Sequence, residues 1–171
     1  MLYVVELNFV NGMKDAERFM PFYAEHMRDL RTTPGLTTAQ RFHSIFPVAS
    51  PFMQIYTITD ASVMQSRAYK SVGGPGHPIV DDHARSLTDW YRNVFDGLEK
   101  MPAVPEGSHI VVVDGRENAA GLPDLPFTWL KSVALDRSVD ERAMAIVTDI
   151  EALKPLAGPK VRIFRPMAPQ F

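Results

Sequence analysis

The amino-acid sequence predicts an α+β fold, in one domain or in two small fused domains. Runs of alternating apolar and polar residues, which are typical of strands, recur along the chain. Apolar residues at spacings of three and four mark amphipathic helices between some of these runs. The chain has 171 residues, of which 46% are hydrophobic, so it can bury a real core and is not a disordered tail.

The first third of the chain has the clearest pattern. Strands are expected at 2–9, 37–46 and 52–59, and a helix is expected at 13–31. The apolar residues of this helix form a single stripe, made of Ala16, Phe19, Met20, Tyr23, Met27 and Leu30. A Pro-Gly pair at 34–35 then turns the chain.

The middle of the chain is predicted to be helical around a loop. A short helix is expected at 60–69, a glycine-rich loop at 72–78 and a longer helix at 79–98. His83 falls on the apolar side of that longer helix. The proline-rich segment 101–106 is the predicted internal boundary.

The second half is predicted to contain strands at 109–114, 127–135 and 160–166. A helix is expected at about 139–150, because Ser138 and the glutamate three residues later have the spacing of a capping box.

A weak internal sequence similarity indicates a partial duplication. The apolar and turn residues that follow Pro51-Phe52 recur, with one insertion, after Pro126-Phe127. We therefore expect residues 1–100 to form one unit, and residues 101–171 to form a truncated second repeat that completes the same domain.

Composition excludes several classes of function. With 18 Lys+Arg against 20 Asp+Glu, the net charge is −2, and no block of like charge suits a nucleic-acid backbone or an anionic membrane. The absence of cysteine excludes disulfides, thiolate nucleophiles and cysteine-held metals. No apolar run is long enough for a membrane span, and residues 1–6 lack the features of a signal peptide. We expect a cytoplasmic protein with no nucleic-acid or membrane partner.

Several motifs occur in a familiar order: Tyr23-Ala24-Glu25-His26, Pro34-Gly35, Arg41-Phe42, Ile55-Tyr56-Thr57-Ile58 and Ser66-Arg67-Ala68-Tyr69. With the strands around them, over residues 2–99, they resemble the dimeric α+β barrel superfamily. Within it, the sequence is most similar to the EthD-like and stress-responsive barrel proteins, many of which have no assigned activity.

The resemblance implies a ferredoxin-like antiparallel sheet with helices on one face, whose other face meets a second sheet to enclose a barrel. A unit of this kind leaves one sheet face to be buried, so we expect a homodimer; the alternative is a fused pseudo-dimer closed by residues 101–171. Such barrels commonly hold small, often aromatic molecules. The second half is too short to supply the large second domain of haem-binding relatives, and we expect no cofactor.

His26 lies on or beside the apolar stripe of the first helix, where a titratable group must be satisfied or used. An imidazole exchanges protons near neutrality, because its ordinary pKa is about 6.5, and a general acid or base typically contributes about 100- to 10,000-fold. Tyr23 or Glu25 could orient it. The alternative is a structural histidine that is hydrogen-bonded to a backbone carbonyl or to the sheet.

Alternation along the strands predicts a polar face on the sheet, since residues two apart share a face. This face would line the barrel interior, and it carries Glu6, Asn8, Arg41, His43, Gln54 and Tyr56. Arg41 and Tyr56 would hold or polarise oxygen atoms of a substrate, and His43 would be a substitute base. The alternative is a wet dimer interface in which Arg41 and Glu6 pair.

His83 and Trp90 are seven residues apart on the predicted second helix and could form the mouth of the same cavity. Aromatic residues at this spacing also occur in ordinary cores. The expected binding residues are therefore Glu6, Asn8, Tyr23, Gln54, His83 and Trp90. We expect no metal site, because the five histidines show no His-x-x-x-His or His-x-x-Glu-His spacing.

These features favour a cofactor-independent enzyme of the isomerase, cyclase or lyase type, which acts by proton transfer on a small hydrophobic metabolite with a carbonyl or phenol group. Two alternatives stay open at this stage. One is a non-catalytic ligand-binding or stress-associated barrel, and the other is a cofactor-free monooxygenase.

Overall fold

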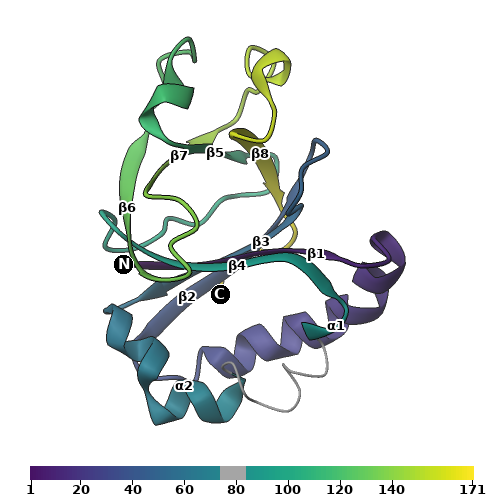
Figure 1. Ribbon diagram of the computed structural model, residues 1–171, viewed down its shortest axis with the longest axis vertical. Helices are drawn as coiled ribbons and strands as arrows, with labels where there is room; N and C mark the ends of the chain where they lie inside the picture. Colours follow the sequence, from purple (N-terminus) through teal and green to yellow (C-terminus); the bar gives the residue numbers. More distant parts are fainter. Residues whose placement is uncertain (74–83) are drawn as a thin grey trace.

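The structure, a computed structural model, describes residues 1–73 and 84–171. Within these residues, eight antiparallel strands close a single barrel in the order β1-β3-β2-β8-β5-β7-β6-β4 (Figure 1). The strands are β1 Leu2–Phe9, β2 Leu36–Ser44, β3 Phe52–Ile58, β4 Leu87–Asp96, β5 His109–Asp114, β6 Thr128–Leu135, β7 Glu141–Val147 and β8 Val161–Pro166. The predicted α+β fold with an antiparallel sheet is confirmed.

Two α-helices cover the outer face of the sheet formed by the first half (Figure 1). Helix α1, Met13–Leu30, buries Ala16, Tyr23, Met27 and Leu30 of the predicted apolar stripe. Helix α2, Arg67–Val72, follows a 3₁₀ turn, η1 Ala61–Gln65, and its first turn is capped by the Ser66 hydroxyl. Both helices therefore pack on one side of the first four strands. Two more 3₁₀ turns, η2 Arg116–Ala119 and η3 Lys154–Leu156, lie in the second half.

The predicted helix over 79–98 is wrong where the structure describes it. Residues 87–96 form strand β4, which pairs with β1 on one side and β6 on the other. The segment contains Trp90, Tyr91, Val94 and Phe95, which are residue types that favour strands. Residues 79–83 of the expected helix lie outside the described residues.

The predicted helix over 139–150 is also wrong. Residues 141–147 form strand β7, which fills the gap between β5 and β6. The Glu, Arg, Ala and Met residues of this segment favour a helix, but two open strand edges provide a full set of backbone partners, and this tertiary pairing overrides the local preference. Ser138 does not cap a helix; its backbone N–H and its hydroxyl bond to the side chain of Asn93 on β4, at 2.8 and 2.9 Å.

The barrel closes within one chain. Strands β5 to β8 cover the sheet face that the helices leave open, and the joins are β2 to β8 and β4 to β6. The proline-rich segment 101–106 is not a free linker, because Met101 and Val104 are buried in the barrel interior. The division of the chain at residue 101 stays a prediction.

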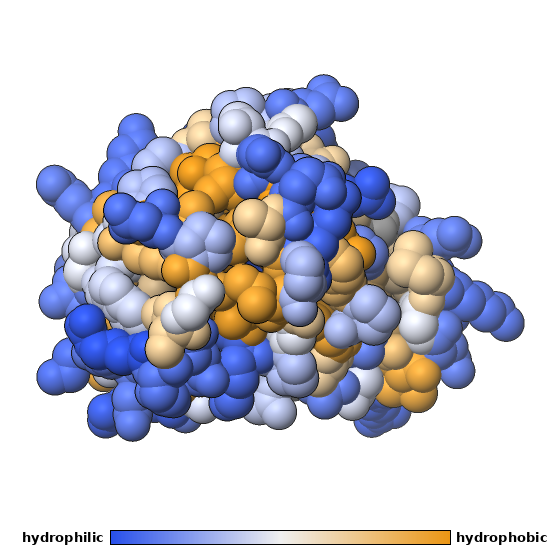
Figure 2. Space-filling model, turned by 90° about the horizontal axis from the view of Figure 1, so that it is seen from above, coloured by the Kyte–Doolittle hydropathy of each residue, from blue (hydrophilic) through white to orange (hydrophobic). Residues whose placement is uncertain are grey.

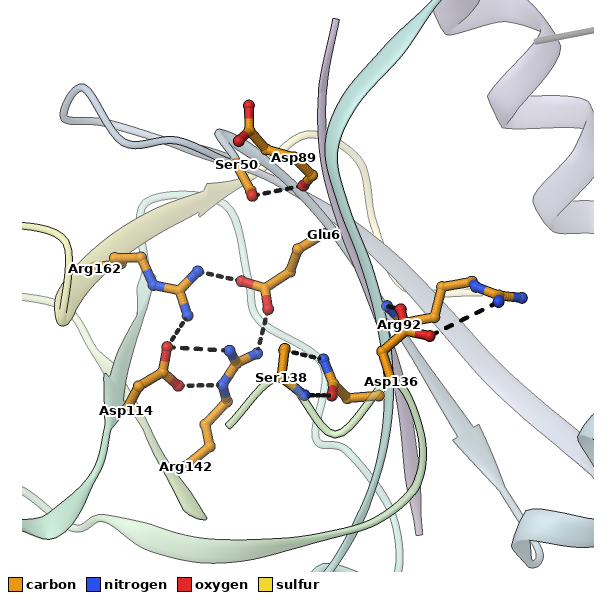
Figure 3. A network of polar contacts seen from close by, with 10 residues as sticks. Glu6, Ser50, Asp89, Arg92, Asp114, Asp136, Ser138, Arg142 and Arg162 are labelled. Carbon is orange, nitrogen blue, oxygen red and sulfur yellow. Dashed lines mark hydrogen bonds and ion pairs between the residues drawn. The ribbon is translucent and has the colours of Figure 1, made fainter. Parts of the chain in front are cut away.

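The barrel interior contains, beside its apolar core, a buried network of four charged side chains, Glu6, Asp114, Arg142 and Arg162 (Figure 3). Arg142 lies 2.7 Å from Glu6 and 2.6 Å from Asp114. Arg162 lies 2.6 Å from Asp114 and also pairs with Glu6. Two cations thus face two anions, which is the arrangement that buried charges require. The predicted alternative of an Arg41–Glu6 pair is not formed.

Glu6 should make the stability of the protein dependent on acidic pH. Burial raises the pKa of the Glu6 carboxyl, but Arg142 and Arg162 lower it by more, so its folded pKa lies below the ordinary value of 4.5. Its contribution to stability is therefore present above about pH 4.5 and is lost as the pH falls through the folded pKa. Urea unfolding between pH 7 and pH 3 should show the wild type losing its advantage over Glu6→Gln as the pH falls. A constant difference between the two proteins would contradict this expectation.

The outer face of the second half carries loops where the first half carries helices. Its buried core, around Val111, Val113 and Ile163, is covered by side chains of the connections between strands. Figure 2, which views the molecule from above, shows hydrophobic surface surrounded by hydrophilic residues. Partly buried Leu122, Leu125, Phe127 and Ile150 contribute apolar atoms to this face. Within the described residues, no α-helix covers these four side chains.

Candidate functional site

A cavity lies between the outer face of β1, β3 and β4 and the helices α1 and α2; we call it the helix–sheet cavity. It is lined by Tyr3, Val5, Leu7, Phe22, Tyr23, His26, Leu30, Gln54, Tyr56, Tyr69, Gly73, Leu87, Trp90 and Arg92. Its volume is about 50 Å³, which is enough for a few water molecules. About half of the lining side chains are aromatic, and the polar groups are the tyrosine hydroxyls and the side chains of His26, Gln54 and Arg92.

Two hydrogen-bonded pairs hold three of the four buried phenols of this cavity. The hydroxyls of Tyr3 and Tyr69 lie 3.0 Å apart, and the Tyr56 hydroxyl donates to Gln54 Oε1 at 2.8 Å. The rings of Tyr3 and Tyr56 also stack, with centroids 5.4 Å apart. A buried tyrosine needs a partner for its hydroxyl, and these pairs supply one.

The phenols of the cavity are neutral near physiological pH. Burial raises the pKa of Tyr3, Tyr56 and Tyr23 well above the ordinary value of 10. Burial also raises the pKa of Tyr69, although the neighbouring Tyr3 hydroxyl and Arg92 counteract part of this effect. Neutral phenols can donate hydrogen bonds, so the cavity presents donors to an oxygen atom of a bound molecule.

His26 on α1 lines the cavity, in agreement with its predicted position on or beside the apolar stripe of this helix. Its half-buried ring stacks on Phe22, with centroids 5.5 Å apart and planes at 13°. Gly73, the residue that follows α2, lies beside the Cε1 and Nδ1 atoms of the same ring. The imidazole is therefore held between an aromatic face and a backbone.

Gly73→Ala should displace His26 and destabilise the protein. Gly73 has φ +140°, a conformation that side chains disfavour, and an added Cβ would overlap the His26 ring. Gly121→Ala is a matched control, because Gly121 has φ +83° with open space around it. Both variants should lose about 1 kcal/mol or more from backbone strain, and Gly73→Ala should lose more. Thermal unfolding and the NMR signal of His26 measure the two effects; equal losses with an unmoved signal would contradict the proposed contact.

The predicted polar face is wrong as a single set, because its members lie on opposite faces of the sheet. In the strand register, Arg41 is opposite Gln54 and His43 is opposite Phe52, whereas Glu6 is opposite Met53. Glu6 therefore faces the barrel interior, and Gln54 faces the helices together with Tyr56. The prediction paired strands by polarity, and a one-residue difference in register exchanges the two faces.

Other predicted site residues lie outside the helix–sheet cavity. Asn8 borders a shallow hollow with Gly12 and Pro47, and its side-chain oxygen accepts a hydrogen bond from the Phe9 N–H. His43 packs against Phe52, with centroids 4.8 Å apart, and borders a separate groove.

Arg41 does not line the cavity but lies near Tyr56, and its charge counteracts part of the pKa increase that burial causes in Tyr56.

Five predicted site residues do meet in the cavity: Tyr23, His26, Gln54, Tyr56 and Trp90. Trp90 comes from strand β4 and not from a helix, and the Arg92 guanidinium lies 5.2 Å from its ring centroid. His83 lies outside the described residues.

The prediction missed Tyr3, Tyr69, Gly73 and Arg92. A signal for Tyr3 was present in the sequence, because a phenol on the apolar face of a strand needs a buried partner.

Within residues 1–73 and 84–171, no group of three or more His, Cys, Asp or Glu side chains is arranged to hold a metal ion. In the same residues, no helix combines the length and the hydropathy that crossing a bilayer requires.

No protein-family model matches this chain, and no curated protein sequence matches it. Several solved structures are similar to it, and three of them are compared with it below. An anthrone oxidase-like protein gives a TM-score of 0.60 at 10% identity, over 99% of this chain and 92% of that one. A proposed chlorite dismutase gives 0.58 at 10% identity, over 98% and 94%. A proposed monooxygenase from Lactobacillus acidophilus gives 0.52 at 9% identity, over 98% and 94%.

At this level of identity the likeness establishes the fold alone. The chain has an α+β barrel fold, with the antiparallel barrel closed by its own second half. The narrower resemblance to the EthD-like branch stays a prediction.

Proposed function

We propose that the helix–sheet cavity binds a small aromatic molecule with a phenol or carbonyl oxygen, and that His26 exchanges a proton with it. The observation that carries this proposal is the meeting of one imidazole with four buried tyrosines inside a wall of aromatic rings. Apolar walls with a few convergent polar groups are characteristic of small-molecule sites. This chemistry needs no cofactor.

The tyrosines would stabilise the charge that proton removal creates. When a base removes a proton next to a carbonyl, or from a phenol, negative charge develops on the oxygen. The Tyr3 and Tyr69 hydroxyls share one hydrogen bond, so one of the two keeps a proton that it can donate to that oxygen, whereas the Tyr56 hydroxyl would turn from Gln54 Oε1 to do so. Arg41 would act through Tyr56, since it lies beside the cavity and not in its wall.

Binding a ring requires side chains to shift, because the cavity of about 50 Å³ holds only a few waters. Phe22 and Trp90 are half-buried side chains in its wall. We propose that they move apart to admit a planar ligand, which they would then contact by stacking.

Cofactor-free oxygenation is a second candidate, because two of the structures compared above are described as anthrone oxidase-like and as a proposed monooxygenase. A CH₂ group between aromatic rings would become C=O, with one atom of O₂ entering the product and the other leaving as water. The substrate would supply all four electrons. The reaction also begins with proton removal, so His26 has the same role in both candidates; oxygen consumption with such a substrate would distinguish them.

A homodimer stays part of the proposal, but the argument from an uncovered sheet face no longer supports it. The sheet face that a second copy was expected to cover is covered by β5 to β8 of the same chain. Sedimentation at micromolar concentration measures the assembly state directly.

A thermal-shift screen against phenols, naphthols, aromatic ketones and lactones tests the proposed function. A ligand that binds only the folded protein at a hundredfold excess over its Kd adds about 2.7 kcal/mol of stability. Tyr56→Phe should weaken a binding ligand by about tenfold, because it removes a buried donor. The control is Tyr91→Phe, since Tyr91 is exposed and does not line the cavity. No shift with any compound, or equal weakening in both variants, would overturn the proposal.

A further inference from the structure

A second concavity lies near the N-terminal end of α1, between the start of this helix, the ends of β2 and β8, and the turn before β5; we call it the His43 groove. Its volume is about 510 Å³, and its lining includes Met13, His43, Phe52, His109, Arg165 and Met167. The proposed function uses none of these residues.

Three of the lining side chains form a row across neighbouring strands. His43 on β2 is directly opposite Arg165 on β8. Arg165 is in turn opposite His109 on β5, because the register pairs Ile110 with Phe164. Residues opposite each other on adjacent strands lie about 5 Å apart on the same face of the sheet. A guanidinium therefore stands between two imidazoles at the floor of the groove.

The groups of this row have unused hydrogen-bonding capacity. His109 Nδ1 is buried without a hydrogen-bond partner among the described residues. Arg165 is exposed, and within residues 1–73 and 84–171 its guanidinium forms no ion pair. A planar guanidinium with free N–H groups matches the two oxygens of a carboxylate.

Apolar side chains flank the row. Met13 and Met167 are exposed at the edge of the groove, and Phe52 packs against His43. Methionine side chains adapt to ligands of different shape, and exposed methionines next to a polar site favour an apolar group there.

The rim also limits the charge of a ligand. Two glutamates, Glu17 on α1 and Glu106 in the loop before β5, line the same groove. Their negative charges oppose a doubly charged anion more strongly than a singly charged one.

We infer that the His43 groove binds a small monocarboxylate with an apolar tail, with the carboxylate on Arg165 between His43 and His109 and the tail against Met13, Phe52 and Met167. This site is separate from the helix–sheet cavity and does not depend on the function proposed for it.

The two imidazoles report occupancy of the groove. Burial lowers the pKa of His43 and of His109, and Arg165 lowers both further, with Lys154 also acting on His109. Glu17 and Glu106 are the acidic groups that line the groove around them. A bound carboxylate would favour the charged imidazoles, so it should raise both pKa values.

The test is NMR of the histidine Cε1–H signals of the full chain, titrated with hexanoate, hexan-1-ol and inorganic phosphate. Hexanoate should shift the signals of His43 and His109 saturably and raise both pKa values, while the His26 signal stays unchanged. Hexan-1-ol and phosphate should bind at least about tenfold more weakly, since each lacks one of the two recognised features.

Arg165→Gln should raise the Kd for hexanoate about tenfold or more, because it removes a charge-assisted contact. Arg67→Gln is the matched control: it removes the same charge from an exposed position on α2 and should leave the Kd unchanged. No shift at millimolar hexanoate, equal binding of hexan-1-ol or phosphate, or equal loss in both variants would overturn the inference. A shift confined to His26 would also overturn it, and would instead place the ligand in the helix–sheet cavity.

Discussion

Arg142→Met should lower the free energy of unfolding by about 3–5 kcal/mol. Arg142 is fully buried and pairs with both Glu6 and Asp114 in the barrel interior. Its loss leaves two carboxylates with Arg162 alone, and an uncompensated buried charge is costly. Methionine retains apolar contact with Phe95, over whose ring the Arg142 guanidinium lies at 5.0 Å, so the loss reports mainly on charge. Urea unfolding at neutral pH gives the measurement.

The control for this prediction is Lys154→Met. Lys154 pairs with Glu151 on the surface, where both side chains are largely exposed. Exposed ion pairs contribute about 0–1 kcal/mol, so this variant should be almost as stable as the wild type. Equal losses in the two variants would contradict the view that the buried network supports the barrel.

A double variant separates the charge balance from the packing. Glu6→Gln combined with Arg142→Met removes one anion and one cation and leaves Asp114 paired with Arg162. Its loss should be smaller than the sum of the single losses, by about 0.5–3 kcal/mol, because the second change relieves the imbalance created by the first. Additive losses would show that the two side chains act independently.

The network also explains why the charged interior could not be predicted from the sequence. Glu6 comes from β1, whereas Asp114, Arg142 and Arg162 come from three strands of the second half. Their meeting depends on the closing of the barrel, which joins residues up to 156 positions apart. Local periodicity shows which residues share a face of one strand, but it does not show which strands face each other across a barrel.

The first four elements were predictable because each has a strong local pattern. Strand β1, helix α1 and strands β2 and β3 lie close to the predicted ranges. Strands β4 and β7 were predicted as helices, and in both cases pairing with neighbouring strands decides the structure. Edge strands need partners, and this requirement depends on the whole sheet.

The candidate site was predictable in part for the same reason. The helical stripe alone placed His26 and Tyr23 against the sheet, and the structure places both in the cavity wall. Gln54 and Tyr56 were assigned to the right strand but to the wrong face. Tyr3 was interpreted as an ordinary core residue, because its partner Tyr69 is 66 positions away.

His26→Gln should lower the turnover of a substrate found in the binding screen by about 100- to 10,000-fold, the usual contribution of a general acid or base. Glutamine keeps polar atoms of similar reach but cannot take up a proton near neutral pH. The cavity walls stay intact, so the Kd of the ligand should change much less than kcat. Steady-state kinetics and NMR titration measure the two quantities on the same protein.

The comparison of kcat with Kd separates catalysis from binding. Asp29→Asn is the control on the same helix, since Asp29 is exposed and does not line the cavity, and it should leave both quantities unchanged. A ligand that binds the wild type without turnover would favour a non-catalytic binding protein. Equal losses of affinity and turnover in His26→Gln would make His26 a binding residue, because a proton-transfer role requires that the transition state lose more than the bound ligand.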